Sequence, residues 1–268
     1  SGEIAIFSQG GAILLNGSAR TLEFAQTKLI APSMTLASGA LSGLSINGKP
    51  IDVGISGREI EGGSLSASFL VRDSIAPEFQ TRLDALSVDL IERLQNSSAD
   101  PTLMIGDAGL FTDAGGFYSP INEIGISGRI SVNAMVDPAN GGDIWRLRDG
   151  IGALTQGAVG ESGQLIRLVN AMGDIKPASA NLGLAIAMSG AGFAEEITSF
   201  WASESSRTDQ DNAYKQSVYS LLRTEELHAT GVDIDKEMQS LLIIEQAYAA
   251  NARVISVLDG LMKKLLEI

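Results

Sequence analysis

The most regular pattern of apolar residues lies within residues 231–268, at the C-terminal end of the sequence. Apolar residues recur there at alternating spacings of three and four, which is typical of a helix that packs along a second helix. The first seam formed by this spacing consists of Leu241, Ile244, Tyr248, Asn251, Ile255, Leu258, Met262 and Leu265. Asn251 is an amide within the seam, and such a residue fixes the register of packing at some cost in stability.

A second seam lies beside the first on the same predicted helix. Its members are apolar, namely Ile243, Ala247, Ala250, Val254, Val257 and Leu261. At about 3.6 residues per turn, the two seams cover roughly half of the helix circumference. The double seam favours packing between molecules over the alternative, in which the helix folds back onto its own domain.

Turn-forming and capping residues mark the start of this helix. Gly231 can adopt the left-handed conformation that ends a preceding helix. Asp233 or Asp235 then offers a carboxylate to the free amides of the next helix. We therefore expect a joint between two helices at residues 230–235.

The N-terminal quarter of the chain has the pattern of β-structure. Short apolar runs between residues 3 and 71 are separated by Gly, Ser, Asn and Pro. Residues 4–7 and 12–15 flank a glycine turn and predict a hairpin. Further short strands are expected at residues 21–30, 41–46, 51–55 and 126–134.

Helical spacing predicts two longer helices in the body of the chain. The first spans residues 77–96, because Pro77 suits a first helical turn. Its apolar stripe, which we expect to pack against other helices, includes Phe79, Leu83, Leu86, Leu90 and Leu94. The second is a long, rather polar helix at residues 192–229, with Trp201 on its apolar side. We expect the two helices to pack antiparallel or nearly so.

These patterns together predict an α+β fold. A β-hairpin-rich segment packs with a long-helix bundle, and a C-terminal helix of the coiled-coil type follows. Short helices are expected near Trp145 and at residues 165–172. We expect residues 1–230 to form the body domain and residues 231–268 to form the C-terminal axial helix.

The composition is that of a globular protein, with 44% hydrophobic and 19% charged residues and a net charge of −13. The negative charge argues against nucleic acid or an anionic bilayer as a partner. No run approaches the roughly 20 apolar residues of a membrane span. The sequence has no cysteine, which excludes disulfides and thiolate chemistry.

Few residues offer catalytic or metal-binding chemistry. His228 is the single histidine, and its place near a predicted helix end suits the helix dipole. Without a second histidine or a cysteine, the sequence lacks the ligands of the usual zinc sites and the residues of the usual Cys/His and Ser/His nucleophile systems. Asp107 with Asp113, or Asp137 with Asp143, could form a carboxylate dyad or a calcium site, although Asp in glycine-rich loops more often makes turns. We therefore expect no catalytic residue, no metal site and no cofactor.

Two stretches of the sequence resemble flagellar axial proteins, and most closely the hook-associated proteins of the hook–filament junction. The C-terminal stretch comprises the joint at residues 231–235, Glu237, the block QAYAANARVI at residues 246–255, and Leu265, Leu266 and Ile268. The other stretch, residues 62–96, has a glycine pair, then Arg72 and Asp73, and then the predicted helix. The resemblance is specific for the axial superfamily and less specific for the member.

This resemblance implies a structural, non-enzymatic subunit of the bacterial flagellum that joins hook to filament by self-packing of helices into a tubular layer. The implied partners are copies of the same protein, the hook protein, the second junction protein and an export chaperone at the C-terminal region. The implied location is the flagellum outside the cell, reached through the flagellar export apparatus without a cleaved signal peptide. A long N-terminal helical segment is also implied, and we expect it to be missing from this chain.

Two alternatives stay open at this point. Another axial protein, such as the hook protein or a distal rod component, has the same terminal signature, although residues 62–96 favour the junction protein. An alternative from a different class is a secreted, acidic calcium-binding protein or enzyme that uses the Asp/Gly loops.

Overall fold

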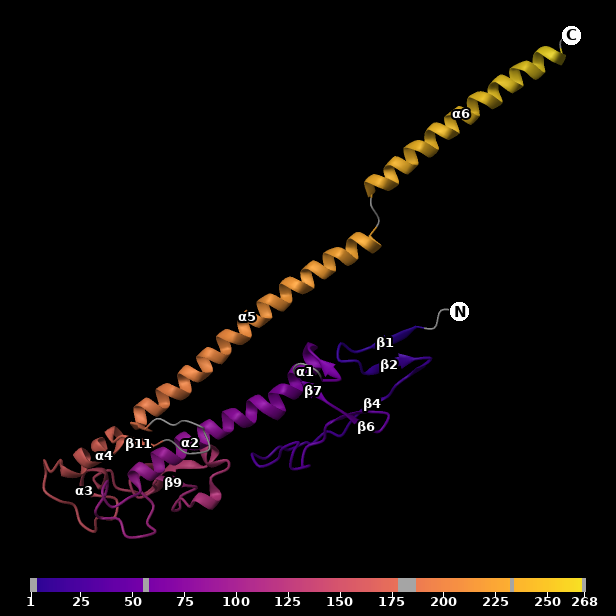
Figure 1. Ribbon diagram of the computed structural model, residues 1–268. Helices are drawn as coiled ribbons and strands as arrows, with labels where there is room; N and C mark the ends of the chain where they lie inside the picture. The colour runs from indigo at the N-terminus through magenta and orange to yellow at the C-terminus, as the bar shows by residue number, and fades with distance from the viewer. Residues whose placement is uncertain (1–3, 55–57, 178–186, 232–233, 267–268) are drawn as a thin grey trace. The chain divides into compact units, whose positions relative to one another are not determined.

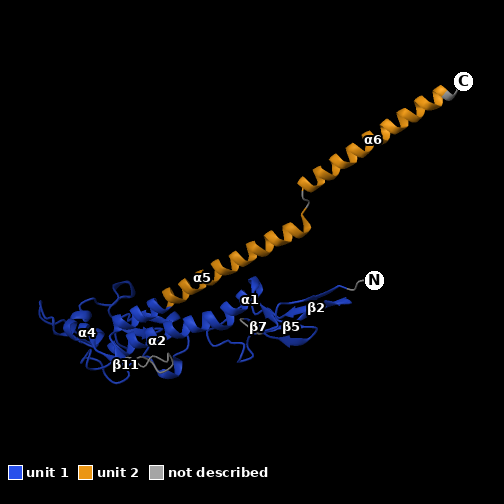
Figure 2. Ribbon diagram, turned by 45° about the horizontal axis from the view of Figure 1, so that its top comes forward, with its two compact units in different colours: residues 1–200 blue, residues 201–268 orange. Residues whose placement is uncertain are grey.

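The computed structural model describes residues 4–54, 58–177, 187–231 and 234–266. Contacts divide the chain into two units, one ending at Phe200 and the other beginning at Trp201 (Figure 2). The division falls within one helix, α5 (Gly190–Thr230). The boundary expected from the sequence lies after residue 230, at the C-terminal end of this helix.

Short strands form the beginning of the first unit. The predicted hairpin is confirmed, since β1 (Ala5–Phe7) pairs antiparallel with β2 (Ile13–Asn16). The strands that follow are shorter than expected, and turns at residues 31–34 and 36–39 lie in the connection between residues 24 and 44. They are β3 (Ser18–Ala19), β4 (Leu22–Phe24), β5 (Leu44–Ile46), β6 (Lys49–Ile51), β7 (Val53–Gly54) and β8 (Ile60–Glu61). The sheet orders are β1-β2-β3 and β4-β5-β6, and β7 pairs with β8 in parallel.

The first long helix begins well before the predicted residue 77. It starts as α1 (Gly63–Leu70), continues through a π-helical turn, η1 (Val71–Ile75), and becomes α2 (Ala76–Leu94) (Figure 1). The predicted start at residue 77 is wrong. It rested on Pro77, because proline has no amide hydrogen and usually lies in the first turn of a helix. The wider π turn directly before Pro77 lets the helix continue past it.

α2 contributes residues to two of the buried apolar clusters described in the first unit. Val88 and Ile91 form one buried cluster with Tyr118 and Ile126. Leu94 forms a second cluster with Ala99 and Ala171, and a third contains Leu103, Val136 and Ile151. The long helix therefore supplies the surface on which the following loops fold.

Those loops contain a second small sheet and several short helices. Strand β9 (Phe111–Asp113) pairs antiparallel with β10 (Ile130–Val132). The strand predicted at residues 126–134 is shorter than expected, because residues 126–128 form a 3-10 turn that Gly125 enters with a φ of 78°. The remaining elements are the 3-10 turns at Pro120–Asn122 and Pro138–Asn140, the helices α3 (Arg146–Asp149) and α4 (Gly163–Gly173), and the paired strands β11 (Lys176–Pro177) and β12 (Ala187–Met188).

The first turns of α5 lie antiparallel to α2 within the first unit. The guanidinium of Arg82 lies 3.4 Å from the centre of the Phe200 ring. About three turns further along α2, Arg93 lies beside Gly190, the first residue of α5. As residue numbers rise along α2 they therefore fall along α5.

The second unit consists of the rest of α5 and of α6 (Ile234–Leu266), which confirms the two long helices predicted at the end of the sequence. α5 has 41 residues and α6 has 33. Every described side chain from Ser205 to Lys264 is exposed. These helices therefore have no buried face of their own along that span.

Candidate self-assembly surface

The first seam of α6 is an exposed apolar strip on the described part of this helix. Its large apolar side chains are between 56% and 77% exposed, namely Leu241, Ile244, Tyr248, Ile255, Leu258 and Met262. Asn251 is exposed as well, and the side chain of Leu265 lies outside the described residues. Burying one such apolar side chain contributes about 1.5–3 kcal/mol. The seam therefore holds a large driving force for packing against another apolar surface.

The second seam is equally open to solvent. Ile243, Val254, Val257 and Leu261 are between 55% and 67% exposed. Small residues, Ala247 and Ala250, separate Ile243 from Val254, so another helix can approach closely in the middle of this face.

The dimensions of α6 indicate that one seam alone makes a weak contact. A helix of this length is about 50 Å long, and a seam about 10 Å wide offers roughly 500 Å². A standard stable interface buries about 800 Å² per partner. The two seams together reach this range, so α6 suits simultaneous contact with more than one neighbour.

Charges at the two ends of α6 support the helix itself. Asp235 and Glu237 lie in its first turn, and Lys263 and Lys264 lie in its last turn. This distribution complements the helix dipole. Lys263 also pairs with Asp259 at 3.1 Å, four residues earlier.

The joint before α6 depends on glycine for a different reason from the predicted one. The left-handed conformation expected for Gly231 is wrong, because its φ is not positive. Its amide donates to the Leu227 carbonyl oxygen at 2.7 Å, as in a helix, and a Cβ at this position would overlap that oxygen. Close approach to the preceding turn therefore requires glycine. Asp233, the other predicted joint residue, lies outside the described residues.

The predicted packing stripe of α2 is buried to different degrees along its length. Phe79 is 43% exposed, and Leu94 is 3% exposed within a core cluster. Leu83, Leu86 and Leu90 are half-buried. Leu86 and Leu90 line a groove of about 390 Å³ together with Met172, Gly173, Ser189, Gly190, Ala191 and Ala194. Trp201, predicted on the same packing surface, is half-buried at the start of the second unit.

Two charged residues of α2 that the sequence analysis did not single out are buried. Asp84 is 4% exposed and Arg93 is 1% exposed. Asp84 lies at the spacing of Val88 and Ile91, whereas Arg93 lies on the other side of the helix, at the spacing of Leu86 and Leu90. A charged residue at such a position is the signal that could have identified them, because a buried charge needs specific partners.

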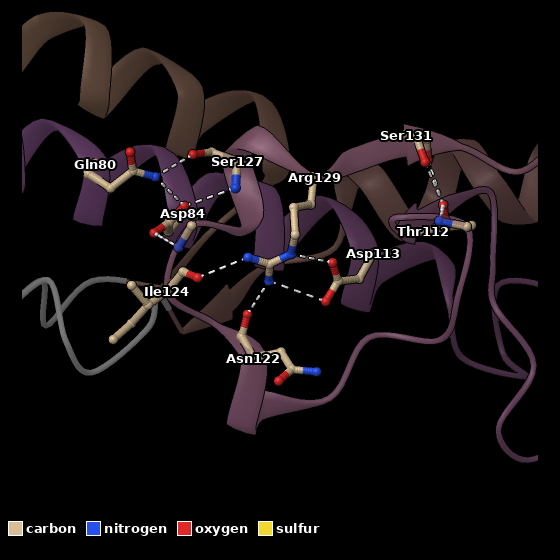
Figure 3. A network of polar contacts seen from close by, with 11 residues as sticks. Gln80, Asp84, Thr112, Asp113, Asn122, Ile124, Ser127, Arg129 and Ser131 are labelled. Atoms are coloured by element: carbon tan, nitrogen blue, oxygen red, sulfur yellow. Dashed lines mark hydrogen bonds and ion pairs between the residues drawn. The ribbon is translucent and has the colours of Figure 1, made fainter. Parts of the chain in front are cut away.

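Asp84 fastens the following loop to α2 (Figure 3). Its carboxylate accepts hydrogen bonds from the Gly125 amide at 2.7 Å, the Ser127 amide at 2.9 Å and Gln80 Nε2 at 2.8 Å. Three donors at one carboxylate satisfy a group that burial would otherwise penalise. This network holds the loop at residues 125–127 against α2.

The acidic pairs considered as a dyad or a calcium site make local structural contacts instead. Asp113 forms a two-pronged ion pair with Arg129, at 2.7 Å and 3.3 Å, and Arg129 also donates to the Ile124 carbonyl oxygen (Figure 3). Asp107 accepts from the Met104 amide in a turn, and Asp137 accepts from the Ala139 amide at a helix start. Among the residues with described positions, no cluster of three or more His, Cys, Asp or Glu side chains could hold a metal ion.

By length and apolar composition alone, part of the exposed helices could cross a membrane. Within the part of the chain that the structure describes, the stretch Gly190–Lys264 contains one window that is long and apolar enough to cross a bilayer. The most apolar part of this stretch, in α6, includes Glu245, Asn251 and Arg253. Polar groups of this kind are costly in hydrocarbon, whereas they are ordinary on a helix that packs with other helices in water.

Comparison with known protein families gives a match that falls on this surface. Residues 225–268, which contain the end of α5, the joint and α6, match the family described as flagellar basal body rod FlgEFG protein C-terminal. No curated protein and no solved structure matches the chain. The helix that exposes two apolar seams is therefore similar to the C-terminal segment of flagellar rod proteins.

Proposed function

We propose that this protein is a structural subunit of the flagellar axis that joins hook to filament, and that its α6 helices pack with those of other copies into a tubular layer. The observation that carries the proposal is the coincidence of the rod-type match with the two exposed seams of α6. One seam facing each of two neighbours is a head-to-tail contact. Contacts of this kind generate rings or helical layers rather than closed pairs.

The junction role, rather than another place along the axis, is supported by residues 62–96. This stretch has the glycine pair, the adjacent Arg72 and Asp73, and the long helix that resemble junction proteins. The hook protein and the second junction protein are then the neighbours above and below the layer. An export chaperone would hold the C-terminal region, because two exposed apolar seams are an aggregation hazard before assembly.

A rod or hook subunit is the second candidate. It is favoured by the description of the matched family, which refers to basal body rod proteins. The two candidates share the same assembly surface, and they differ only in where along the axis the subunit is placed.

Deletion of the gene in the source bacterium separates these candidates. We expect electron microscopy to show finished hooks without filaments, and an immunoassay to find flagellin in the medium. Absent hooks would instead assign the protein to the rod or hook. Normal flagella would contradict both candidates, and complementation with the intact gene controls for effects on neighbouring genes.

A further inference from the structure

Three Asn-Gly pairs lie in turns of the first unit, and they offer the same chemistry. They are Asn16-Gly17, Asn47-Gly48 and Asn140-Gly141. In such a pair the backbone nitrogen of the glycine can attack the side-chain amide carbon of the asparagine, because glycine has no side chain to obstruct the approach. Asparagine is for this reason among the thermolabile residues of proteins. All three asparagines are exposed, so exposure does not distinguish the pairs.

Asn47 is held by hydrogen bonds at both reacting groups, in the turn between β5 and β6. Its Oδ1 accepts from the Thr21 amide at 2.8 Å, which fixes the side-chain carboxamide. The Gly48 amide donates to Glu23 Oε2 at 3.1 Å. Attack requires this amide to lose its proton, and the neighbouring carboxylate opposes the negative charge that would form.

Asn140 is held in a similar way, at the end of the 3-10 turn Pro138–Asn140. Its Nδ2 donates to Asp137 Oδ2 at 2.7 Å. The Gly141 amide donates to the carbonyl oxygen of Pro138 at 3.2 Å. The carboxamide and the attacking nitrogen are therefore both engaged, and the turn must open locally before they can react.

Asn16 differs from the other two asparagines at both groups. It is the last residue of β2, and Gly17 connects this strand to β3 with a φ of 68°. Among the residues that the structure describes, neither the Asn16 carboxamide nor the Gly17 amide makes a hydrogen bond. No heavy atom lies within 4 Å of the space that a Cβ at Gly17 would take. The carboxamide is therefore free to turn toward the Gly17 nitrogen.

We propose that Asn16 is a deamidation site, and that the fold protects Asn47 and Asn140 from the same reaction. The Gly17 amide gives its proton to hydroxide, and its nitrogen forms a bond to Asn16 Cγ. The bond from Cγ to Nδ2 then breaks, and the side-chain nitrogen takes a proton from water and leaves as ammonia. Water opens the resulting cyclic imide at either carbonyl, which leaves aspartate or isoaspartate. The reaction consumes water and releases ammonia, with no oxidation or reduction.

Either product changes the turn between β2 and β3. Both add a negative charge at residue 16. Isoaspartate also places an additional carbon in the backbone, directly beside the pairs Leu15–Ala19 and Asn16–Ser18. Because β3 is an edge strand of its sheet, the reaction alters the edge of the sheet as well as its charge.

The test follows the three asparagines in the complete chain, folded and in concentrated urea, during incubation in warm, mildly alkaline buffer. Digestion after lysine and arginine places them in separate peptides, and mass spectrometry measures the acid formed in each. Asn16→Gln is the control for the first site, because glutamine would have to close a larger ring. Glu23→Ala removes the acceptor of the Gly48 amide, and circular dichroism checks that this variant stays folded.

We expect Asn16 in the folded protein to form acid roughly tenfold faster than Asn47 or Asn140, because only the latter two require local opening. In urea the three rates lie within about twofold of one another, since glycine follows each asparagine and the turns are lost. The Asn16→Gln peptide gains no acid, and Glu23→Ala raises the rate at Asn47 roughly fivefold.

Equal rates at the three sites of the folded protein, or a slower rate at Asn16, would overturn the inference. An unchanged rate at Asn47 in folded Glu23→Ala would overturn the protection assigned to the Gly48 amide. Rates that differ in urea as they do in the folded protein would show that local sequence, and not the fold, sets the order.

Discussion

At the scale of single residues, the first unit depends on polar groups placed inside an apolar periodicity. Asp84 is 4% exposed and lies on the face of α2 that also carries Val88 and Ile91. It binds two backbone amides of the loop that contains Ile126, a member of the same core cluster. One carboxylate therefore fixes the loop whose apolar side chain completes the core.

We predict that Asp84→Ala lowers the free energy of unfolding by about 3 kcal/mol, because the amides of Gly125 and Ser127 would stay buried without an acceptor. Urea unfolding followed by circular dichroism measures this. Asp107→Ala is the control, since Asp107 is exposed and accepts one turn hydrogen bond; we expect a loss below about 1 kcal/mol there. Equal losses in the two variants would contradict the role given to Asp84.

A second residue of the same cluster predicts a pH dependence. Burial, followed by the nearby charges of Glu123 and Glu92, raises the pKa of Tyr118 from 10.0 to about 12. The neutral phenol is thus favoured in the folded state. Its contribution to stability is complete below pH 10 and is lost as the pH rises from about 10 to about 12.

We therefore predict that Tyr118→Phe reduces the loss of unfolding free energy between pH 9.5 and pH 11.5, because phenylalanine has no proton to release on unfolding. Urea unfolding at the two pH values, for the original protein and the variant, measures the difference. An identical pH dependence in both proteins would show that Tyr118 does not titrate with folding.

At the scale of elements, α6 offers a direct test of its seams. Ile255→Asp places a carboxylate in the first seam, where assembly would have to bury it. Ser256→Asp introduces the same charge one residue later, outside both seams. We predict that the Ile255 variant raises the concentration needed for self-association by roughly a hundredfold, whereas the Ser256 variant leaves it nearly unchanged. Sedimentation over a concentration series measures the onset of self-association for both variants. Equal effects of the two substitutions would show that the seam does not mediate packing between copies.

The elements also show how far sequence reasoning reaches. The two C-terminal helices were predictable because apolar and polar spacing is a local property that their residues carry without help from distant ones. The start of α1 was missed, since Pro77 usually opens a helix and the π turn at residues 71–75 depends on local backbone geometry. The partners of Arg93 were beyond reach, because Ala171, Asp174 and Met188 lie far away in sequence and offer only carbonyl oxygens that every residue has.

At the scale of the whole molecule, the two units draw on different sources of stability. Among its described residues, the first unit has buried apolar clusters and a buried polar network. The second has no buried side chain among the described residues from Ser205 to Lys264. Most of the stability of a helix comes from packing of its apolar face, and helix propensity alone is marginal in water. In isolation the second unit therefore lacks the buried apolar contacts that stabilise the first unit.

This difference predicts that residues 233–268 gain stable helix only when they pack. In a dilute monomer, hydrogen exchange should be slow in α2 and fast throughout α6, because an unpacked helix opens with a free energy close to zero. On assembly the amides of α6 should become protected while those of α2 change little. The Ile255→Asp variant, held at the same high concentration, is the control that should stay unprotected. Full protection of α6 in the dilute monomer would mean that the helix already has a partner within its own chain, and that the seams are covered before any second copy arrives.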